Sequence, residues 1–309
     1  MINVKDNNTM MYTDLAVEIQ EECSGRQGEI PGVVLEQYKE DDKCIRVTKI
    51  QIKTADGAKR MGRPIGNYMT LESADKGHSI TKLPDTKLLA SYINKLLPSS
   101  AHSFLIVGLG NANMTADALG PLTIEKMAQS GMASYTSMIV PGVFAQTGME
   151  SCEIIQGIVQ QTSPDCIITI DALAARNTKR LNRTIQVTDT GINPGSGVGN
   201  HRHGLNEKSI GVPVIAIGVP TVVDAATIVN DTMFNLITAM NQSSELKTLG
   251  NTLGELNETE KYELIRELLS PNLNTMFVTP KDIDESVKRL SFTISEGLNI
   301  ALIDHNIFA

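Results

Sequence analysis

Short apolar runs separated by helical patterns organise the middle of the chain. The runs at residues 104–107, 137–140, 166–170, 184–187 and 213–219 each have the length of a buried strand. The segments between them carry apolar residues at helical spacing. Strands that alternate with helices are typical of βαβ units. We therefore expect an α/β fold with a mostly parallel sheet that is flanked by helices.

The regions on either side of these runs have different patterns. Residues 15–100 are expected to be a β-rich N-terminal part, because residues 47–52 alternate apolar and polar positions as a half-exposed strand does. Residues 101–241 form the expected α/β core. Residues 242–309 are expected to hold C-terminal helices, the last of which repeats apolar residues at helical spacing.

Local signals predict where several elements begin and end. A helix is expected from Asp85 to Leu97, since a proline follows directly and stops it. Asp56 and Gly57 form a dipeptide that is typical of a turn. Pro220 is expected to begin a long helix, because proline is well suited to the first helical position.

The composition narrows the classes of function. The chain has 309 residues, a net charge of -8 at pH 7 and no Trp, and 4% of its residues are aromatic. The basic, aromatic footprint of a nucleic-acid site is missing, so we expect no direct nucleic-acid binding. No signal peptide or membrane-length apolar run occurs, so no membrane association is expected. The four cysteines lack zinc-ligand spacing, and we expect reduced, mostly buried thiols in a cytoplasmic compartment.

Two carboxylates follow buried strands and are the main candidates for chemistry. Gly108 and Gly110 end the first apolar run, and Asp117 falls at the start of the next helix. Asp171 directly follows the run at residues 166–170. The carboxyl ends of parallel strands share one edge of a sheet, so the two acids are expected to meet there. One would act as a base toward water and the other as an acid. Taken alone, Asp117 is equally well explained as a helix N-terminal charge.

A glycine-rich loop at residues 189–200 connects two of the core strands. Its backbone at Gly195, Gly197 and Gly199 could approach a ligand closely. It is not a Walker motif, since no Gly-Lys-Ser/Thr follows, and Ser196 lacks the GxSxG context of a nucleophile. A surface loop without a ligand and a wall of a substrate cleft are both open interpretations.

Three further residues are candidates with ordinary alternatives. His201 and His203 alternate, so both imidazoles could face one way on an extended segment. Two carboxylates and a histidine suit a divalent metal ion, whereas solvated loop histidines are the alternative. Arg176 follows Asp171 by five residues and is a candidate for pairing an acidic side chain of a substrate.

Several long segments stand out along the chain: LIVGLGNANMTADALGP, VPGVFAQTGME, IITIDALAAR, DTGINPGSGVGN and GVPVIAIGVPTVVDA, together with TDLAVE near the N-terminus. They resemble segments of the germination proteases of spore-forming bacteria, and the resemblance covers nearly the whole chain. It implies an endopeptidase in an α/β fold that is shared with hydrogenase-maturation peptidases. Asp117 and Asp171 would be its catalytic residues.

The resemblance also implies how the protein is made and used. Germination proteases are zymogens that remove a short N-terminal piece autocatalytically, at an acidic residue followed by a hydrophobic residue and Ala. Asp14-Leu15-Ala16 has this order, which places the cut between Asp14 and Leu15. Residues 1–14 would be the propeptide and residues 15–309 the peptidase domain. The implied substrates are small acid-soluble spore proteins, degraded in the cytoplasm of the spore core by a homotetramer without a cofactor.

Two alternatives stay open. One is a metal-dependent endopeptidase that uses the same acids and a histidine, because the site of hydrogenase-maturation peptidases resembles a Glu/Asp/His metal cage. The other is a non-catalytic module that holds a basic partner with its acidic surface and glycine-rich loops. Residues 242–256 look shortened relative to the family, which leaves any function of a missing insert open.

Overall fold

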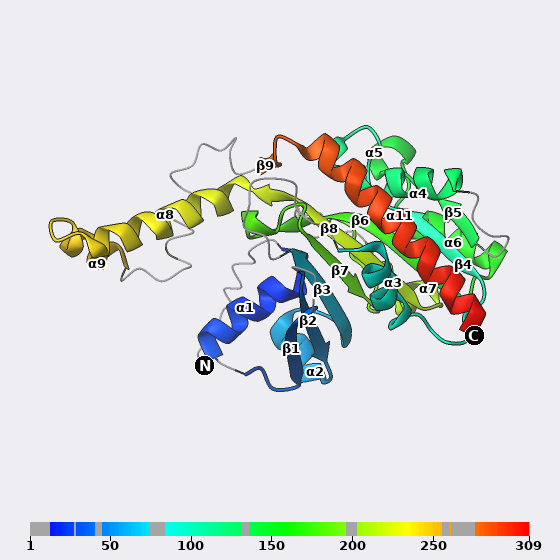
Figure 1. Ribbon diagram of the computed structural model, residues 1–309, viewed down its shortest axis with the longest axis horizontal. Coiled ribbons are helices and arrows are strands. Elements are labelled where there is room, and N and C mark those ends of the chain that lie inside the picture. Colours follow the sequence, from blue (N-terminus) through cyan, green and yellow to red (C-terminus); the bar gives the residue numbers. More distant parts are fainter. Residues whose placement is uncertain are drawn as a thin grey trace, which may run out of the picture.

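One mixed sheet with helices on both faces forms the body of the protein (Figure 1). Its strand order is β1-β2-β3-β7-β8-β6-β4-β5, and β9 pairs with β8. The expected α/β class is therefore confirmed. The computed structural model describes residues 13–27, 29–40, 45–73, 84–130, 136–195, 203–254, 260 and 276–308.

Parallel pairing runs through most of the α/β core. β4 (Phe104–Gly108) pairs with β5 (Thr136–Ile139) on one side and with β6 (Cys166–Ala175) on the other. β6 in turn pairs with β8 (Val214–Asp224). β7 (Thr184–Thr188) is antiparallel to β8. Each of the five apolar runs thus forms a strand, as the sequence predicts.

Three N-terminal strands extend this sheet. β1 (Val33–Glu40), β2 (Ile45–Ile52) and β3 (Gly66–Ser73) form an antiparallel series. β3 then pairs with β7, with Tyr68 opposite Thr188. The N-terminal strands and the core therefore share one sheet.

The turn predicted at Asp56 and Gly57 is wrong, because both residues lie in helix α2 (Ala55–Met61). The Oγ1 of Thr54 accepts a hydrogen bond from the Gly57 N–H at 3.1 Å and caps the first turn. A left-handed residue, Gly62, ends the helix. These two caps outweigh the turn preference of the Asp-Gly pair.

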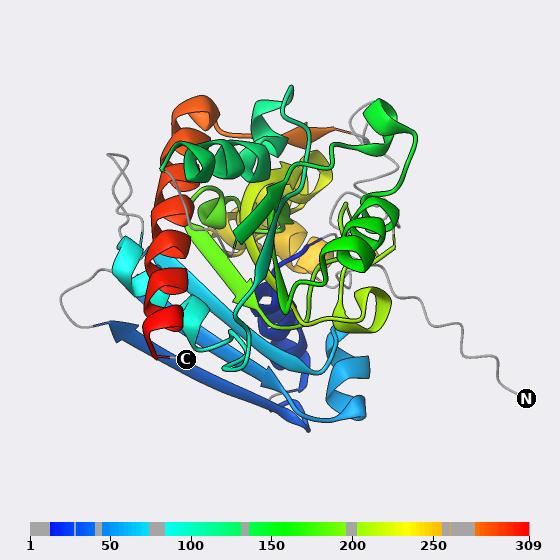
Figure 2. The ribbon, with the colours of Figure 1, turned by 90° about the vertical axis from the view of Figure 1, so that its right-hand side faces the viewer.

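Three helices cover one face of the sheet. They are α3 (Thr86–Asn94), α4 (Leu119–Gln129) and the long α11 (Ile283–Phe308). Figure 2 shows α11, drawn in red, running across this face. Asp85 caps α3, close to the predicted helix start. The apolar sides of these helices and the strands beneath them form the largest buried cluster of the described residues.

The opposite face is covered in two parts. α6 (Ser151–Thr162) and α7 (Glu207–Ile210) pack over β4, β6 and the start of β8. α1 (Ala16–Gln27) and α2 pack over the N-terminal strands and the far end of β6. Leu15, directly before α1, is 0% exposed in this second cluster. The chain therefore enters the core at its first described residues.

The helix start predicted at Pro220 is wrong. β8 continues to Asp224, and α8 (Ala225–Gln242) begins only there, with the Asp224 side chain as its N-cap. The pairing of β6 with β8 shifts register between Leu173 and Ala174, next to Pro220. A residue without an N–H group is tolerated at such a bulge.

Two helices project from the body as an arm. α8 continues away from the sheet and is followed by α9 (Lys247–Gly254), as Figure 1 shows. Large apolar side chains such as Phe234, Leu236 and Leu249 are exposed on it. The helix predicted to end before Pro271 lies outside the described residues. Within the described chain, no helix combines the length and apolar character needed to span a membrane.

Candidate active site

A glycine turn after β4 places Asp117. Gly110 has a φ of 108°, and a Cβ on it would lie 2.0 Å from the carbonyl oxygen of Asp117. Only glycine fits this close approach. Asp117 ends the short turn η1 (Thr115–Asp117), and its Oδ2 accepts a hydrogen bond from the Asn111 N–H at 2.8 Å. The loop and the carboxylate therefore hold each other in place.

Asp171 lies inside β6, so the prediction that the strand ends at Ile170 is wrong. β6 continues to Ala175 because its second half pairs with the extended β8, with Asp171 opposite Gly218. Asp171 is 5% exposed, and its Oδ1 accepts from the Ala172 N–H at 2.9 Å. The sequence from Asp171 onward consists of alanines and a leucine, which hides the strand.

Short contacts join the two acidic segments. The Leu109 N–H, directly before the Gly110 turn, donates to the carbonyl of Ile170 at 2.8 Å. The Oγ1 of Thr221 in β8 donates to the carbonyl of Ala116 at 2.6 Å. The turn that carries Asp117 is thus attached to the strand that carries Asp171 and to its neighbour. The sequence predicts this neighbourhood at one sheet edge, and the catalytic roles of the two acids stay a prediction.

The described part of the glycine-rich loop is fixed at its start. Asp189 accepts from the Asn67 N–H at 2.7 Å and from Asn67 Nδ2 at 2.6 Å. Gly195 lies in a turn with a φ of 74°. Gly197 and Gly199, which are predicted to contact substrate, lie outside the described residues, as do Ser196 and His201.

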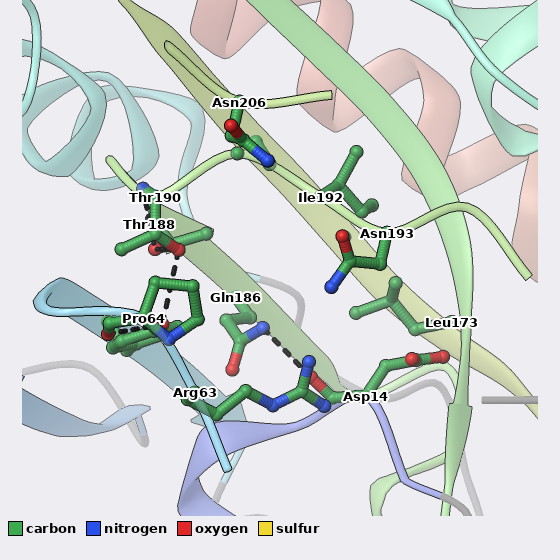
Figure 3. A pocket seen from close by; sticks show the side chains of 14 residues that line it. Asp14, Arg63, Pro64, Leu173, Gln186, Thr188, Thr190, Ile192, Asn193 and Asn206 are labelled. Atoms are coloured by element: carbon green, nitrogen blue, oxygen red, sulfur yellow. Dashed lines mark hydrogen bonds between the residues drawn. The ribbon is translucent and has the colours of Figure 1, made fainter. Parts of the chain in front are cut away.

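A cleft of about 530 Å³, partly open to solvent, lies over β7 and β8. Figure 3 shows polar side chains around it from distant parts of the chain. Arg63 and Gln186 approach it from one side, and Asn193 and Asn206 from the other. The sequence analysis does not single out any of these four residues, because no local motif marks them.

The predicted processing site closes one end of this cleft. The Asp14 N–H donates to the Ala174 carbonyl at 3.0 Å, and the Ala174 N–H donates to Asp14 Oδ2 at 2.9 Å. Arg63 Nη2 donates to the Thr13 carbonyl at 2.8 Å, and Gln186 Nε2 donates to that of Asp14 at 3.3 Å. The Asp14–Leu15 bond is therefore held in a packed segment before any cut.

Arg176 lies beyond the end of β6, about 16 Å along an extended strand from Asp171. Its guanidinium is 3.7 Å from a carboxylate oxygen of Glu22 on α1. The structure does not bring this side chain to Asp171, and its role toward a substrate stays a prediction. Nearby, the sequence analysis misses a buried ion pair in which Arg180 Nη1 lies 3.3 Å from Glu18 Oε1.

His203 is exposed, and its Nδ1 lies 2.7 Å from Glu150 Oε2. The Glu150 carboxylate also accepts from the His203 backbone N–H at 3.2 Å. Across the described ranges, no three His, Cys, Asp or Glu side chains are grouped to share a metal ion. The ligand set of two aspartates and His203 is therefore not assembled in this conformation.

The described cysteines are free thiols, and burial disfavours ionisation of two of them. Burial raises the pKa of Cys166 to about 12. Burial also raises the pKa of Cys152. A thiolate nucleophile needs a lowered pKa, so neither residue has the environment of a catalytic cysteine. Cys44 lies outside the described residues.

Comparison with known proteins identifies the class and then the family. The family model described as germination protease matches residues 10–245 and 238–307. The chain is therefore a peptidase with an α/β fold. It belongs to the germination protease family. The two matched pieces meet at residues 238–245, next to the region that looks shortened in the sequence.

Curated relatives agree over almost the full length. The germination protease of Clostridium tetani (strain Massachusetts / E88) is 45% identical over 307 residues, which cover 94% of each chain. The germination protease of Bacillus subtilis (strain 168) is 36% identical over 350 residues, covering 96% of this chain and 94% of the relative. Both alignments include the segments of Asp117 and Asp171.

Solved structures overlap less well. The [NiFe] hydrogenase maturation protease HycI from Thermococcus kodakarensis KOD1 is 16% identical, with a TM-score of 0.38. The overlap covers 67% of this chain and 98% of that one. The hydrogenase maturating endopeptidase HybD from E. coli has a TM-score of 0.27 and covers 38% of this chain. Overlaps at these scores carry no conclusion about the site.

Proposed function

We propose that the protein is an endopeptidase that initiates the degradation of small acid-soluble spore proteins during germination. It acts in the spore core, as a homotetramer and without a cofactor. It is made as a zymogen that cuts itself between Asp14 and Leu15. Membership of the germination protease family supports the peptidase activity. The substrates, the self-processing and the assembly are carried over from the family resemblance.

The observation that carries the mechanism is the attachment of the Asp117 turn to the strand of Asp171. One carboxylate takes a proton from water as the water oxygen attacks the scissile carbonyl carbon. The other carboxyl group protonates the amide nitrogen as the C–N bond breaks. Two coupled acids suit this exchange, because repulsion between their charges favours the state that holds one proton between them.

Isosteric variants of the two acids test this mechanism. We expect Asp117→Asn and Asp171→Asn each to lower hydrolysis of a purified small acid-soluble spore protein by at least about 10³-fold, because an amide neither accepts nor supplies the proton. Asp284→Asn, at an exposed position on α11, is the matched control and should keep full activity. Thermal unfolding checks that all three variants fold. Full activity in either site variant would refute the assignment.

Intact mass tests the processing step. Full-length protein held at mildly acidic pH should lose residues 1–14, whereas Asp117→Asn should keep them. Loss of the same residues from both proteins would contradict self-processing.

Two further measurements address the alternatives. Activity that survives a strong chelator supports the acid pair, whereas loss that zinc restores would identify the metal-dependent alternative. No hydrolysis of any spore protein, with tight binding instead, would favour the non-catalytic module.

A further inference from the structure

The hydroxyl group of Thr13 joins two buried groups. The Leu15 N–H donates to Thr13 Oγ1 at 3.1 Å, and that hydroxyl in turn donates to Glu18 Oε2. Glu18 is 4% exposed, and Leu15 is 0% exposed. Two groups that share one oxygen lie at most about 6 Å apart, which is two hydrogen-bond lengths.

The proposed cut would change both partners of this hydroxyl. Hydrolysis of the Asp14–Leu15 bond adds the OH of water to the Asp14 carbonyl carbon and a hydrogen to the Leu15 nitrogen. Near neutral pH the new acid then releases its proton and the new amine binds one. Thr13 departs with residues 1–14. Glu18 Oε2 thereby loses a donor just where a positive amine has been formed.

We propose that Glu18 is the binding site for the α-ammonium group that processing creates at Leu15. This inference rests on the proposed cut between Asp14 and Leu15. The ammonium takes the place of the Thr13 hydroxyl and donates directly to Glu18 Oε2. A separation of at most two hydrogen bonds is closed by a small movement of the first residue.

The groups on both sides of the proposed pair are held in place. Glu18 Oε2 accepts from the Arg176 N–H at 2.7 Å, and Oε1 accepts from the Asn177 N–H at 2.9 Å. The next residue after the new terminus, Ala16, donates its N–H to Gln186 Oε1 at 2.8 Å. These contacts do not involve residues 1–14, so they persist after the cut and keep the terminus beside Glu18.

The local charge also favours an added cation. The residues around Glu18 come from α1, the end of α2, β3, the segment after β6, and α8. They include one more acid than bases, so a cation completes the balance. Without Glu18, burial and the positive end of the α1 dipole would oppose an ammonium. The acids are Glu18, Glu21, Glu22, Glu72 and Asp231, and the bases are Arg63, Arg176, Lys179 and Arg180.

The site would link the state of the N-terminus to the catalytic strand. Glu18 holds the backbone at Arg176 and Asn177, directly after β6, which carries Asp171. In the full-length chain, the Thr13 hydroxyl completes this arrangement, and in the processed chain the ammonium does so. Glu18 is thus a positioning residue that acts through the end of β6.

The test uses a chain that begins at Leu15, made by removing a ubiquitin-like fusion partner with its specific hydrolase. A free α-amine has a pKa of about 7.7 to 8.0. Pairing with Glu18 raises this pKa in the folded state only. The stabilisation is then complete below about pH 7.7 and is lost as pH rises through the folded pKa. For each pKa unit, we expect the melting temperature to fall by about 3 to 5 °C between pH 7.5 and 10.

Two matched chains isolate this effect. The full-length Asp117→Asn chain has an amide at Leu15, and a processed chain with one extra glycine before Leu15 moves the ammonium by about 3.8 Å. Both should lack the additional fall in melting temperature. Equal pH profiles in all three chains, or a melting temperature that rises with pH only in the Leu15 chain, would overturn the proposal.

Acylation of the α-amine, followed by mass spectrometry, gives a direct second readout. At pH 8 the Leu15 amine should react at least about tenfold more slowly in the processed chain than in its Glu18→Gln variant, because pairing keeps it protonated. If Glu18→Gln does not fold, the glycine-extended chain serves as the comparison. Equal rates would overturn the proposal. The hydrolase makes the terminus, so failure of self-processing would leave this test intact and would be seen separately by intact mass.

Discussion

Replacing Gly120 with alanine tests how closely α4 must approach the two strands of the site. Gly120 lies in the first turn of α4, directly over β4 and β6. A Cβ there would lie 2.4 Å from the Leu109 carbonyl oxygen and 2.6 Å from that of Ile170. Both are backbone atoms, and neither can rotate away. Ordinary contacts begin at 3.4 Å, so the start of α4 must shift by about 1 Å.

This shift has two expected consequences. Overpacking of this kind costs about 1 to 3 kcal/mol, which lowers the melting temperature of a domain this size by several degrees. The displaced helix begins two residues after Asp117, whereas Asp171 stays in β6. A misplacement of about 1 Å lowers turnover by about 10²-fold. We therefore expect weak hydrolysis from Gly120→Ala at temperatures where it is fully folded.

The control is another helical glycine. A Cβ on Gly157, in α6, meets nothing within 4 Å, and the residue is exposed. Gly157→Ala should therefore keep activity and gain up to about 1 kcal/mol of stability. Thermal unfolding and hydrolysis of a small acid-soluble spore protein measure both variants. A melting temperature and a turnover number for Gly120→Ala equal to those of the unchanged protein would refute the packing argument.

Two further predictions follow from shifted pKa values. Burial raises the pKa of Cys166 to about 12, whereas a thiol in the unfolded chain titrates near 8.5. The stability that this difference provides is complete below about pH 8.5 and falls as pH rises; iodoacetamide at pH 9 should label Cys166 only in denaturant, and rapid labelling of the folded protein would contradict its burial. Hydrogen bonds from the His102 and Ser103 backbone and the Ser103 hydroxyl lower the pKa of Asp165. Asp165→Asn should lower the melting temperature at pH 7, and the difference should vanish below about pH 3, where both side chains are neutral; a constant difference would contradict the contribution of its charge.

The sequence predicts strands well where a buried run contains only apolar residues. β4 and β5 are recovered from such runs to within a residue or two. It fails where a strand continues through residues with other preferences. β6 passes through Asp171 and a row of alanines, and β8 passes through Pro220. Pairing between these two strands, which is a tertiary effect, outweighs the local preference.

Candidate site residues are predictable to the extent that a local turn fixes them. The close approach of Gly110 to Asp117 spans seven residues, and the spacing of glycines reveals it. Glu18 and Arg180 are 162 positions apart, and only the fold shows that they pair. The same holds for Gln186 and the segment around Asp14. No pattern in one sequence encodes contacts over such separations.

The junction between β3 and β7 has a consequence for synthesis on the ribosome. β3 is complete at Ser73, yet its partner ends only at Thr188. At about 5 to 20 residues per second, the N-terminal strands wait roughly 6 to 23 s for that partner to be made. During this interval the outer edge of β3 has unpaired backbone groups that can bind other strands. Folding of the nascent chain is therefore expected to be slow, and to depend on protection of β3 until the core emerges.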